Sequence, residues 1–150
     1  MIEVVCPTPE DTETLGSRLA ASLRPGDVIV LAGGLGAGKT LFTKGVATGL
    51  GVDEPVVSPS FVLVRQYRSG FIPVIHADVY RLSSLNEFED LDVFELAEDG
   101  ILVIEWGEAV ESILPEDHLR IEFRVDEEGC RTLKFTGEGD WAARDLGGVA

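Results

Sequence analysis

A glycine-rich segment directly after a short aliphatic run constrains this chain more than any other feature. Residues 33–40 read G-G-L-G-A-G-K-T, which matches G-x-x-x-x-G-K-[ST], and residues 28–31 before them read V-I-V-L. Such a continuous apolar run is typical of a strand buried on both faces. Glycines let the backbone after the strand turn its N–H groups toward phosphate oxygens, beside the positive end of the next helix. The pattern predicts a strand, a phosphate-binding loop and a helix over residues 39–50.

The two side chains that end the loop have the chemistry that a nucleotide site needs. Lys39 is expected to reach the β- and γ-phosphates. Thr40 is expected to place its hydroxyl on a Mg²⁺ ion that bridges those phosphates and neutralises charge in the transition state. The four fixed positions of the motif recur by chance in a chain of this length at a rate of roughly one per cent or less. We therefore expect a nucleotide hydrolase.

Two further apolar segments end in an acid. Residues 101–105 read I-L-V-I-E, and residues 74–78 read V-I-H-A-D. Ligands bind at the carboxyl ends of strands in such sheets, so both acids are expected near the phosphates. Because Glu105 follows the longer aliphatic run, we expect it to be the acid associated with Mg²⁺, and Asp78 to lie further out or orient water. His76 is more often a buried strand histidine than a catalytic base.

The base of the nucleotide is approached by exclusion. The only asparagine, Asn86, is followed by Glu87, so the guanine-recognition motif N-K-x-D cannot be built. Asp78 is followed by Val79, Tyr80 and Arg81, which excludes the GTPase switch motif D-x-x-G as well. The sequence therefore disfavours GTP as the substrate, and we expect ATP with Mg²⁺.

The rest of the chain alternates helix and strand patterns within one domain. A helix is expected from a cap at Asp11 and Thr12 to about Leu23, and another opens with a capping box at Ser84 and Glu87. Further strands are expected at residues 61–67, 73–77, 101–105, 119–125 and 132–135. Strands alternate with helices at first and then follow one another closely. This order predicts an α/β fold, a three-layer domain of the P-loop NTPase type with a mixed, mainly parallel sheet.

Length and composition limit the remaining choices. The 150 residues suit a single domain, of which the last dozen look like a weakly ordered tail. With 27 acidic against 12 basic residues, the chain carries a net charge of −15, which repels a polyanion, so strong direct nucleic-acid binding is not expected. No apolar stretch approaches the roughly 20 residues that span a bilayer, and there is no signal-peptide pattern, so a cytoplasmic protein without membrane contact is expected. Cys6 and Cys130 are expected to be ordinary thiols.

Several segments in their order resemble one family. The loop, S-P-S-F at residues 58–61, H-A-D-V-Y-R at residues 76–81, Glu87 and E-W at residues 105–106 together resemble the TsaE family of bacterial ATPases of tRNA threonylcarbamoyladenosine biosynthesis. The resemblance covers nearly the whole chain. It implies an ATPase, weak alone, that works with TsaB- and TsaD-like subunits to modify the adenosine beside certain tRNA anticodons. ATP binding and hydrolysis would reset or activate that complex.

The resemblance also implies roles for individual positions. Catalytic roles fall on Lys39, Asp78 and Glu105, and metal contacts fall on Thr40 and Glu105. Together with the loop pattern, it predicts nucleotide contacts at Gly33, Gly36, Ala37, Gly38, Lys39, Thr40 and Leu41.

Three residues beyond these positions have open roles. Ser60 stands where the family has threonine and keeps a hydroxyl that could sense the γ-phosphate or the metal. Trp106 could line the nucleotide pocket, anchor a partner or pack in the core. Arg81 could neutralise phosphate charge or pair with a nearby carboxylate such as Glu87 or Glu89.

Three other positions are interpreted more modestly. Gly34 replaces the aspartate that is usual in the family's loop. Thr12 is explained equally by helix capping and by a place near the adenine that the resemblance implies. Arg131 is expected to form a surface ion pair.

Two other functions remain open from the sequence. A P-loop kinase acting on a small metabolite is the first alternative, but it usually needs an arginine-bearing lid, and no such cluster is visible. A nucleotide-gated binding module that hydrolyses little is the second.

Overall fold

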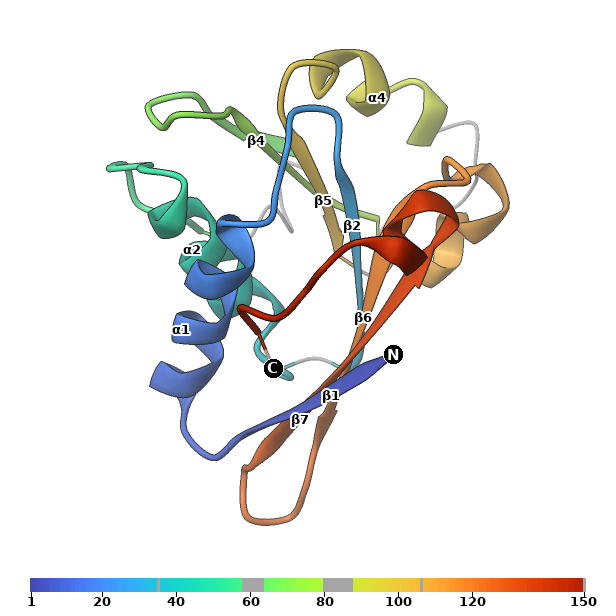
Figure 1. Ribbon diagram of the computed structural model, residues 1–150. Helices are drawn as coiled ribbons and strands as arrows, with labels where there is room; N and C mark the ends of the chain where they lie inside the picture. The colour runs from blue at the N-terminus through green and yellow to red at the C-terminus, as the bar shows by residue number, and fades with distance from the viewer. Residues whose placement is uncertain (35, 58–63, 80–87, 106, 150) are drawn as a thin grey trace.

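The fold is organised around one seven-stranded sheet, shown in Figure 1. The computed structural model describes residues 1–34, 36–57, 64–79, 88–105 and 107–149. The strands are β1 (Ile2–Cys6), β2 (Val28–Ala32), β3 (Val64–Tyr67), β4 (Val74–Asp78), β5 (Ile101–Glu105), β6 (His118–Val125) and β7 (Arg131–Glu138). Their order across the sheet is β1-β7-β6-β2-β5-β4-β3, which places β2 at the centre.

The sheet is mixed, as the sequence predicts. β2 pairs in parallel with β5 and β6, and β4 pairs in parallel with β5. β7 is antiparallel to β1 and β6, and β3 is antiparallel to β4. The strands β1, β2, β4, β5 and β6 therefore share one direction, and β3 and β7 oppose it. The central strands are buried nearly throughout, which explains why their sequences are continuous apolar runs.

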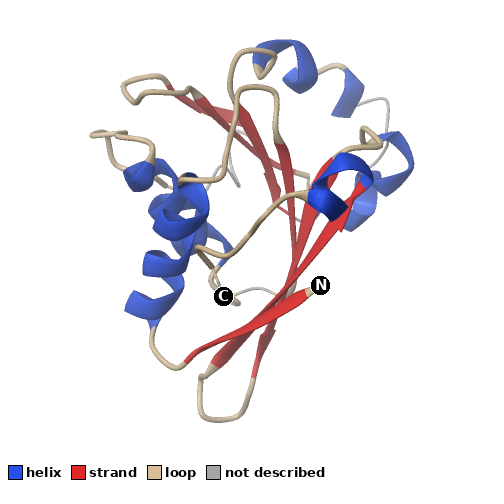
Figure 2. Ribbon diagram, viewed as in Figure 1, coloured by secondary structure: helices blue, strands red, loops and turns tan. Residues whose placement is uncertain are grey.

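Helices cover both faces of the sheet and complete three layers (Figure 2). The helices α1 (Pro9–Ala20) and α2 (Lys39–Gly49) lie together on one face, while α4 (Val93–Leu96) and the 3₁₀ helix η1 (Gly107–Ile113) lie toward the other. Alternate residues of β2 divide between two apolar clusters. Ile29 and Leu31 join the cluster under α1 and α2, and Val28 and Val30 join the cluster that includes Val93 of α4. The core is thus two apolar layers, one on each side of the sheet.

Glycines allow α1 and α2 to approach closely. A Cβ atom on Gly45 would lie 1.9 Å from the carbonyl oxygen of Glu13, and one on Gly16 would lie 2.3 Å from that of Phe42. Ser17 Oγ donates a hydrogen bond of 2.9 Å to the Gly45 carbonyl across the same contact. Because the glycine-rich loop leads directly into α2, this contact helps to set the position of the loop.

The start of α1 differs from the predicted cap at Asp11 and Thr12. The N-cap is Thr8, whose hydroxyl accepts from the Asp11 N–H at 3.2 Å, while Asp11 Oδ2 accepts from the Thr8 N–H at 3.1 Å. Pro9 suits the first helical position because its φ is already helical and its missing N–H would have no partner there. Thr12 is therefore inside the helix, and it is fully buried.

Residues 139–149 are packed against the rest of the domain, which differs from the weakly ordered tail expected there. They begin with the 3₁₀ helix η2 (Gly139–Ala143) and then cross back toward α1 (Figure 1). Trp141, Leu146 and Val149 are buried in the cluster under α1 and α2. Burial of these three apolar side chains stabilises the packing of the segment against the domain. Its many small and polar residues gave no indication of this packing.

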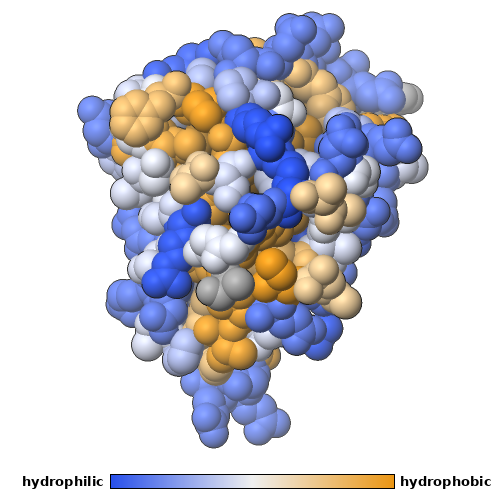
Figure 3. Space-filling model, in the orientation of Figure 1, coloured by the Kyte–Doolittle hydropathy of each residue, from blue (hydrophilic) through white to orange (hydrophobic). Residues whose placement is uncertain are grey.

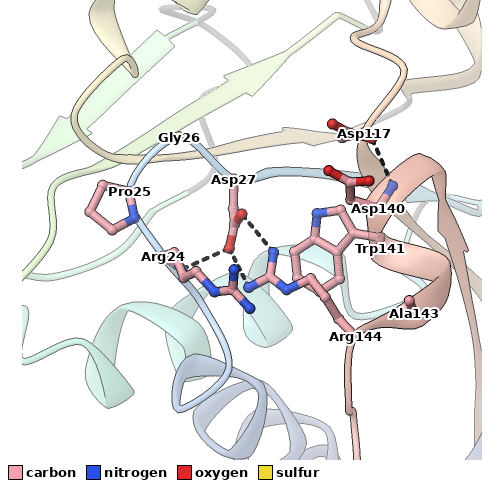
Figure 4. A pocket seen from close by; sticks show the side chains of 9 residues that line it. All are labelled: Arg24, Pro25, Gly26, Asp27, Asp117, Asp140, Trp141, Ala143 and Arg144. Carbon is pink, nitrogen blue, oxygen red and sulfur yellow. Dashed lines mark hydrogen bonds and ion pairs between the residues drawn. The ribbon is translucent and has the colours of Figure 1, made fainter.

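An ion pair also holds this segment, at a pocket of about 550 Å³ beside the start of β2 (Figure 4). Arg144 binds both oxygens of Asp27, with Nη1–Oδ1 2.7 Å and Nη2–Oδ2 3.0 Å. Its guanidinium lies 3.7 Å from the centre of the Trp141 ring. The pocket is at the opposite end of β2 from the glycine-rich loop, so it is separate from the predicted nucleotide site.

The visible surface is mostly hydrophilic, with apolar groups between charged ones (Figure 3). The turn between β6 and β7 is acidic, and Asp126 Oδ1 accepts there from the N–H groups of Glu128 and Cys130 at 2.9 Å each. In the part of the chain that the structure describes, no helix has the length and apolar character required to cross a bilayer.

Two predicted elements fall partly outside the described residues. The strand expected from residue 61 is described from Val64 onward. The capping box at Ser84 and Glu87 lies outside the description, and the helix expected to continue from it is interrupted at Asp92, whose φ of 53° is left-handed, before α4 begins.

Candidate functional site

The glycine-rich loop joins the central strand to the helix that follows it. β2 ends at Ala32 and α2 begins at Lys39, as the motif predicts. Gly36 and Gly38 have φ values of 75° and 103°, in the region that favours glycine. The loop therefore lies at the carboxyl end of β2. The neighbouring strands β5 and β6 are parallel to β2, so their carboxyl ends lie at the same edge of the sheet.

Lys39 lies inside this loop. Only 5% of its surface is exposed, and its Nζ donates to the carbonyl oxygens of Gly33 at 2.7 Å and Gly34 at 2.9 Å. The ammonium group thus holds the first part of the loop from within. A phosphate oxygen is a stronger acceptor for such a charged donor than a neutral carbonyl, so these contacts can be exchanged for a ligand.

Arg131 holds the second part of the loop. It lies at the start of β7, and its Nε donates to the Ala37 carbonyl at 3.0 Å while Nη2 donates to the Gly36 carbonyl at 3.4 Å. The predicted surface ion pair is therefore wrong, because the guanidinium binds backbone oxygens of the loop instead. A Cβ atom on Gly38 would lie 2.9 Å from Arg131 Nε, so glycine also provides the space for this contact.

The two predicted acids lie side by side. Asp78 ends β4 and Glu105 ends β5, and the two residues are directly paired in the parallel register. They are 3% and 4% exposed, respectively. Thr40 Oγ1 is 3.3 Å from Glu105 Oε1 and 3.4 Å from Oε2, so the hydroxyl donates to that carboxylate. The fold brings Thr40, Asp78 and Glu105 together from three separate elements.

His76, two residues before Asp78 on β4, also contacts this group of side chains. It is fully buried in β4, and its Nε2 contacts Glu105 Oε2. Its Nδ1 has no hydrogen-bond partner among the described residues. The sequence favours an ordinary buried strand histidine at this position. No local sequence pattern links His76 to Glu105, which is 29 positions away.

The donor set near Thr40 suits a hard cation. The hydroxyl of Thr40 and the carboxylates of Glu105 and Asp78 are all oxygen donors, which Mg²⁺ prefers over nitrogen and sulfur. Across the described ranges, no group of three or more His, Cys, Asp and Glu side chains forms a metal cage. Mg²⁺ commonly binds through one or two carboxylates and the phosphates of its substrate. The residues therefore fit a Mg²⁺–nucleotide site better than a site for the metal alone.

A cysteine lies next to the loop without a catalytic setting. Cys6 of β1 is opposite Arg131 in the strand register, and burial raises the pKa of its thiol. A raised pKa keeps the thiol protonated and unreactive. Cys6 and Cys130 are both free, in agreement with the prediction of ordinary thiols.

The remaining predicted positions are only partly visible. Leu41 is half-buried on the first turn of α2. Gly34 has open space where a Cβ atom would be, so the structure has room for the aspartate that the family usually carries there. Ser60, Arg81 and Trp106 lie outside the described residues, and their roles stay predictions.

Comparison with known proteins decides the family. The model of the family described as "Threonylcarbamoyl adenosine biosynthesis protein TsaE" matches residues 6–133. The chain belongs to the TsaE family. TsaE relatives include a Bacillus subtilis protein, 41% identical over 88% of this chain and 83% of its own length. A Streptomyces coelicolor relative is 44% identical over 91% of this chain and 97% of its own length. Both carry the name "tRNA threonylcarbamoyladenosine biosynthesis protein TsaE".

A solved structure agrees with this assignment. The crystal structure of Bacillus subtilis YdiB superposes with a TM-score of 0.78 and 35% sequence identity, covering 93% of this chain and 86% of that chain. The resemblance to the TsaE family and the predicted fold class are both confirmed.

Proposed function

We propose that this TsaE-family chain is a Mg²⁺-dependent ATPase that acts in the cytoplasm with TsaB- and TsaD-like subunits in tRNA threonylcarbamoyladenosine formation. One observation carries the proposal. Lys39 in the loop, Thr40 at the start of α2 and Glu105 at the end of β5 converge at the carboxyl edge of the sheet, with Thr40 in contact with Glu105.

Each of these residues has a distinct task in the proposed reaction. Lys39 would exchange its hydrogen bonds with the Gly33 and Gly34 carbonyls for hydrogen bonds with the β- and γ-phosphates. Thr40 and Glu105 would hold Mg²⁺, which would supply charge neutralisation at the phosphoryl oxygens. Asp78, beside Glu105, orients the attacking water. A buried, preorganised set of charges stabilises the transition state more than the same groups would in water.

The charge of the chain and its family membership support the proposed partner requirement. A net charge of −15 opposes binding of tRNA by this chain alone. We therefore assign tRNA binding to the partner subunits, and ATP binding and hydrolysis, which reset or activate the complex, to this chain. Its relatives are named for the same tRNA modification.

The test measures phosphate release and threonylcarbamoyladenosine formation together. The chain is incubated with ATP and Mg²⁺, with and without TsaB- and TsaD-like subunits and tRNA. We expect slow phosphate release by the chain alone, faster release with the partners, and no modified adenosine when this chain is omitted. Tight ATP binding without phosphate release, even with the partners present, would show a binding module instead. Transfer of phosphate to a small metabolite would show a kinase.

A further inference from the structure

His76 is a buried titratable residue that the proposed reaction does not use. It lies on the same face of β4 as Asp78, two residues away, and is directly opposite Val103 of β5 in the strand register. None of its surface is exposed, yet its Nε2 reaches Glu105 Oε2. An imidazole fully enclosed in a sheet and aimed at a carboxylate differs from a histidine that only fills space.

The contacts of the ring fit one tautomer. An ionised carboxylate can only accept a hydrogen bond, so toward such a Glu105 the ring donates from Nε2. Nδ1 is then an acceptor, and among the described residues it has no partner. With this tautomer, no N–H group of the ring is buried without an acceptor.

The neighbours of Glu105 explain why its carboxylate needs to be held. Asp78 is directly opposite Glu105, and like charges at directly opposed positions repel each other. Thr40 Oγ1 lies at nearly equal distances, 3.3 and 3.4 Å, from the two oxygens of Glu105, so it does not strongly favour one of them. The contact with His76, in contrast, is to Oε2.

We propose that His76 is a positioning residue that binds Oε2 of Glu105 and so presents Oε1, beside the Thr40 hydroxyl, to Mg²⁺. This inference rests on the proposed function. Carboxylates that bind metals are themselves held by hydrogen bonds, and loss of such a partner weakens metal affinity about 10–100-fold. His76 therefore contributes to the Mg²⁺ requirement and not to nucleotide binding as such.

The test separates binding of nucleotide from binding of Mg²⁺. A fluorescent ATP analogue is titrated with the purified chain in EDTA and then across a range of Mg²⁺ concentrations, and thermal unfolding is followed in parallel. The variants are His76→Leu, which cannot donate, and His76→Gln, whose amide can. The matched control is His118→Gln, because His118 is the only other histidine of the chain and lies at the start of β6, where its Nδ1 contacts the Pro115 carbonyl.

We expect His76→Leu to raise the half-saturating Mg²⁺ concentration about tenfold or more. Binding in EDTA stays unchanged, His76→Gln is shifted less than His76→Leu, and His118→Gln matches the wild type. A wild-type Mg²⁺ requirement in His76→Leu would overturn the proposal. Equal shifts in the Leu and Gln variants, or equal losses in EDTA and in Mg²⁺, would show that His76 acts through packing.

Two further outcomes are distinguishable. If His76→Leu does not fold, His76→Asn replaces it, because the shorter asparagine amide does not reach Glu105. The half-saturating Mg²⁺ concentration must then rise in His76→Asn and rise less in His76→Gln. If the wild type binds the analogue with no dependence on Mg²⁺, the proposed function fails and this inference fails with it.

Discussion

Arg131 offers a sharp test of how the glycine-rich loop is held. Replacing Arg131 with Gln removes a guanidinium that binds the carbonyls of Ala37 and Gly36 from outside the loop. Lys39 would still bind the Gly33 and Gly34 carbonyls from inside. The variant therefore loosens one half of the loop and leaves the other half held.

The expected loss of nucleotide affinity follows from the two hydrogen bonds that Arg131 donates to the loop. A hydrogen bond from a charged donor contributes about 1.5–3 kcal/mol when it is well formed. The Nε bond to Ala37, at 3.0 Å and partly buried, meets that description, whereas the Nη2 bond to Gly36, at 3.4 Å and exposed, contributes little. Taking the lower limit for one bond, about 1.5 kcal/mol, the equilibrium constant between the binding-competent loop and its other conformations falls about tenfold, and nucleotide affinity falls by up to that factor.

The assay is titration of a fluorescent ATP analogue at saturating Mg²⁺. Arg131→Gln should weaken binding by up to about tenfold, and Arg131→Lys should lie between this variant and the wild type, because lysine keeps the charge but not the fork of donors. Arg124→Gln is the matched control, since Arg124 is exposed on β6 in the same hairpin. Wild-type affinity in Arg131→Gln, or an equal loss in Arg124→Gln, would refute the argument.

Four other variants test the remaining parts of the molecule. Lys39→Ala should abolish phosphate release in the presence of the partners, and because Lys39 is buried and binds two carbonyls, it should also lower the melting temperature slightly. Glu105→Gln should raise the Mg²⁺ concentration needed for phosphate release, since an amide is a poorer ligand for a hard cation than a carboxylate. Asp78→Asn should instead slow turnover at saturating Mg²⁺. The reverse pattern would show that the two acids have exchanged roles. Arg144→Ala should lower the free energy of unfolding in urea by about 2–3 kcal/mol, below the roughly 3–5 kcal/mol of a fully buried pair, because the Arg144 and Asp27 side chains are each 12% exposed. Nucleotide binding should not change in Arg144→Ala, as the ion pair lies at the other end of β2; a loss of binding would contradict this separation.

Local sequence patterns were enough to predict much of the fold and the core of the candidate site. The strand, loop and helix around the glycine motif appear where expected, and β5 has the predicted bounds. These predictions succeed because a central strand must be apolar on both faces and because the loop needs residues that tolerate positive φ. Asp78 and Glu105 could be expected together because the carboxyl ends of parallel strands meet at one edge.

Local patterns were less informative near the two ends of the chain. The cap of the first helix was expected at Asp11 and Thr12, whereas Thr8 and Asp11 form the capping box and Pro9 takes the first helical position. The final residues contain only three large apolar side chains, Trp141, Leu146 and Val149, and all three are buried in the core. Whether a short segment packs depends on the surface that receives it, which is absent from its own sequence.

Other features depend on residues that are distant in the chain. Arg131 lies 94 positions from Ala37, and only the pairing of β7 with β6 and β1 brings its guanidinium to the loop. His76 reaches Glu105 because β4 and β5 are adjacent in parallel register. The sequence by itself determined which backbone could receive a phosphate and which side chains could carry the chemistry, because both follow from local conformation and residue type. Only the tertiary structure decided which charged groups hold that loop and those acids, because these contacts join strands and helices whose order in the sheet is not encoded in any local pattern.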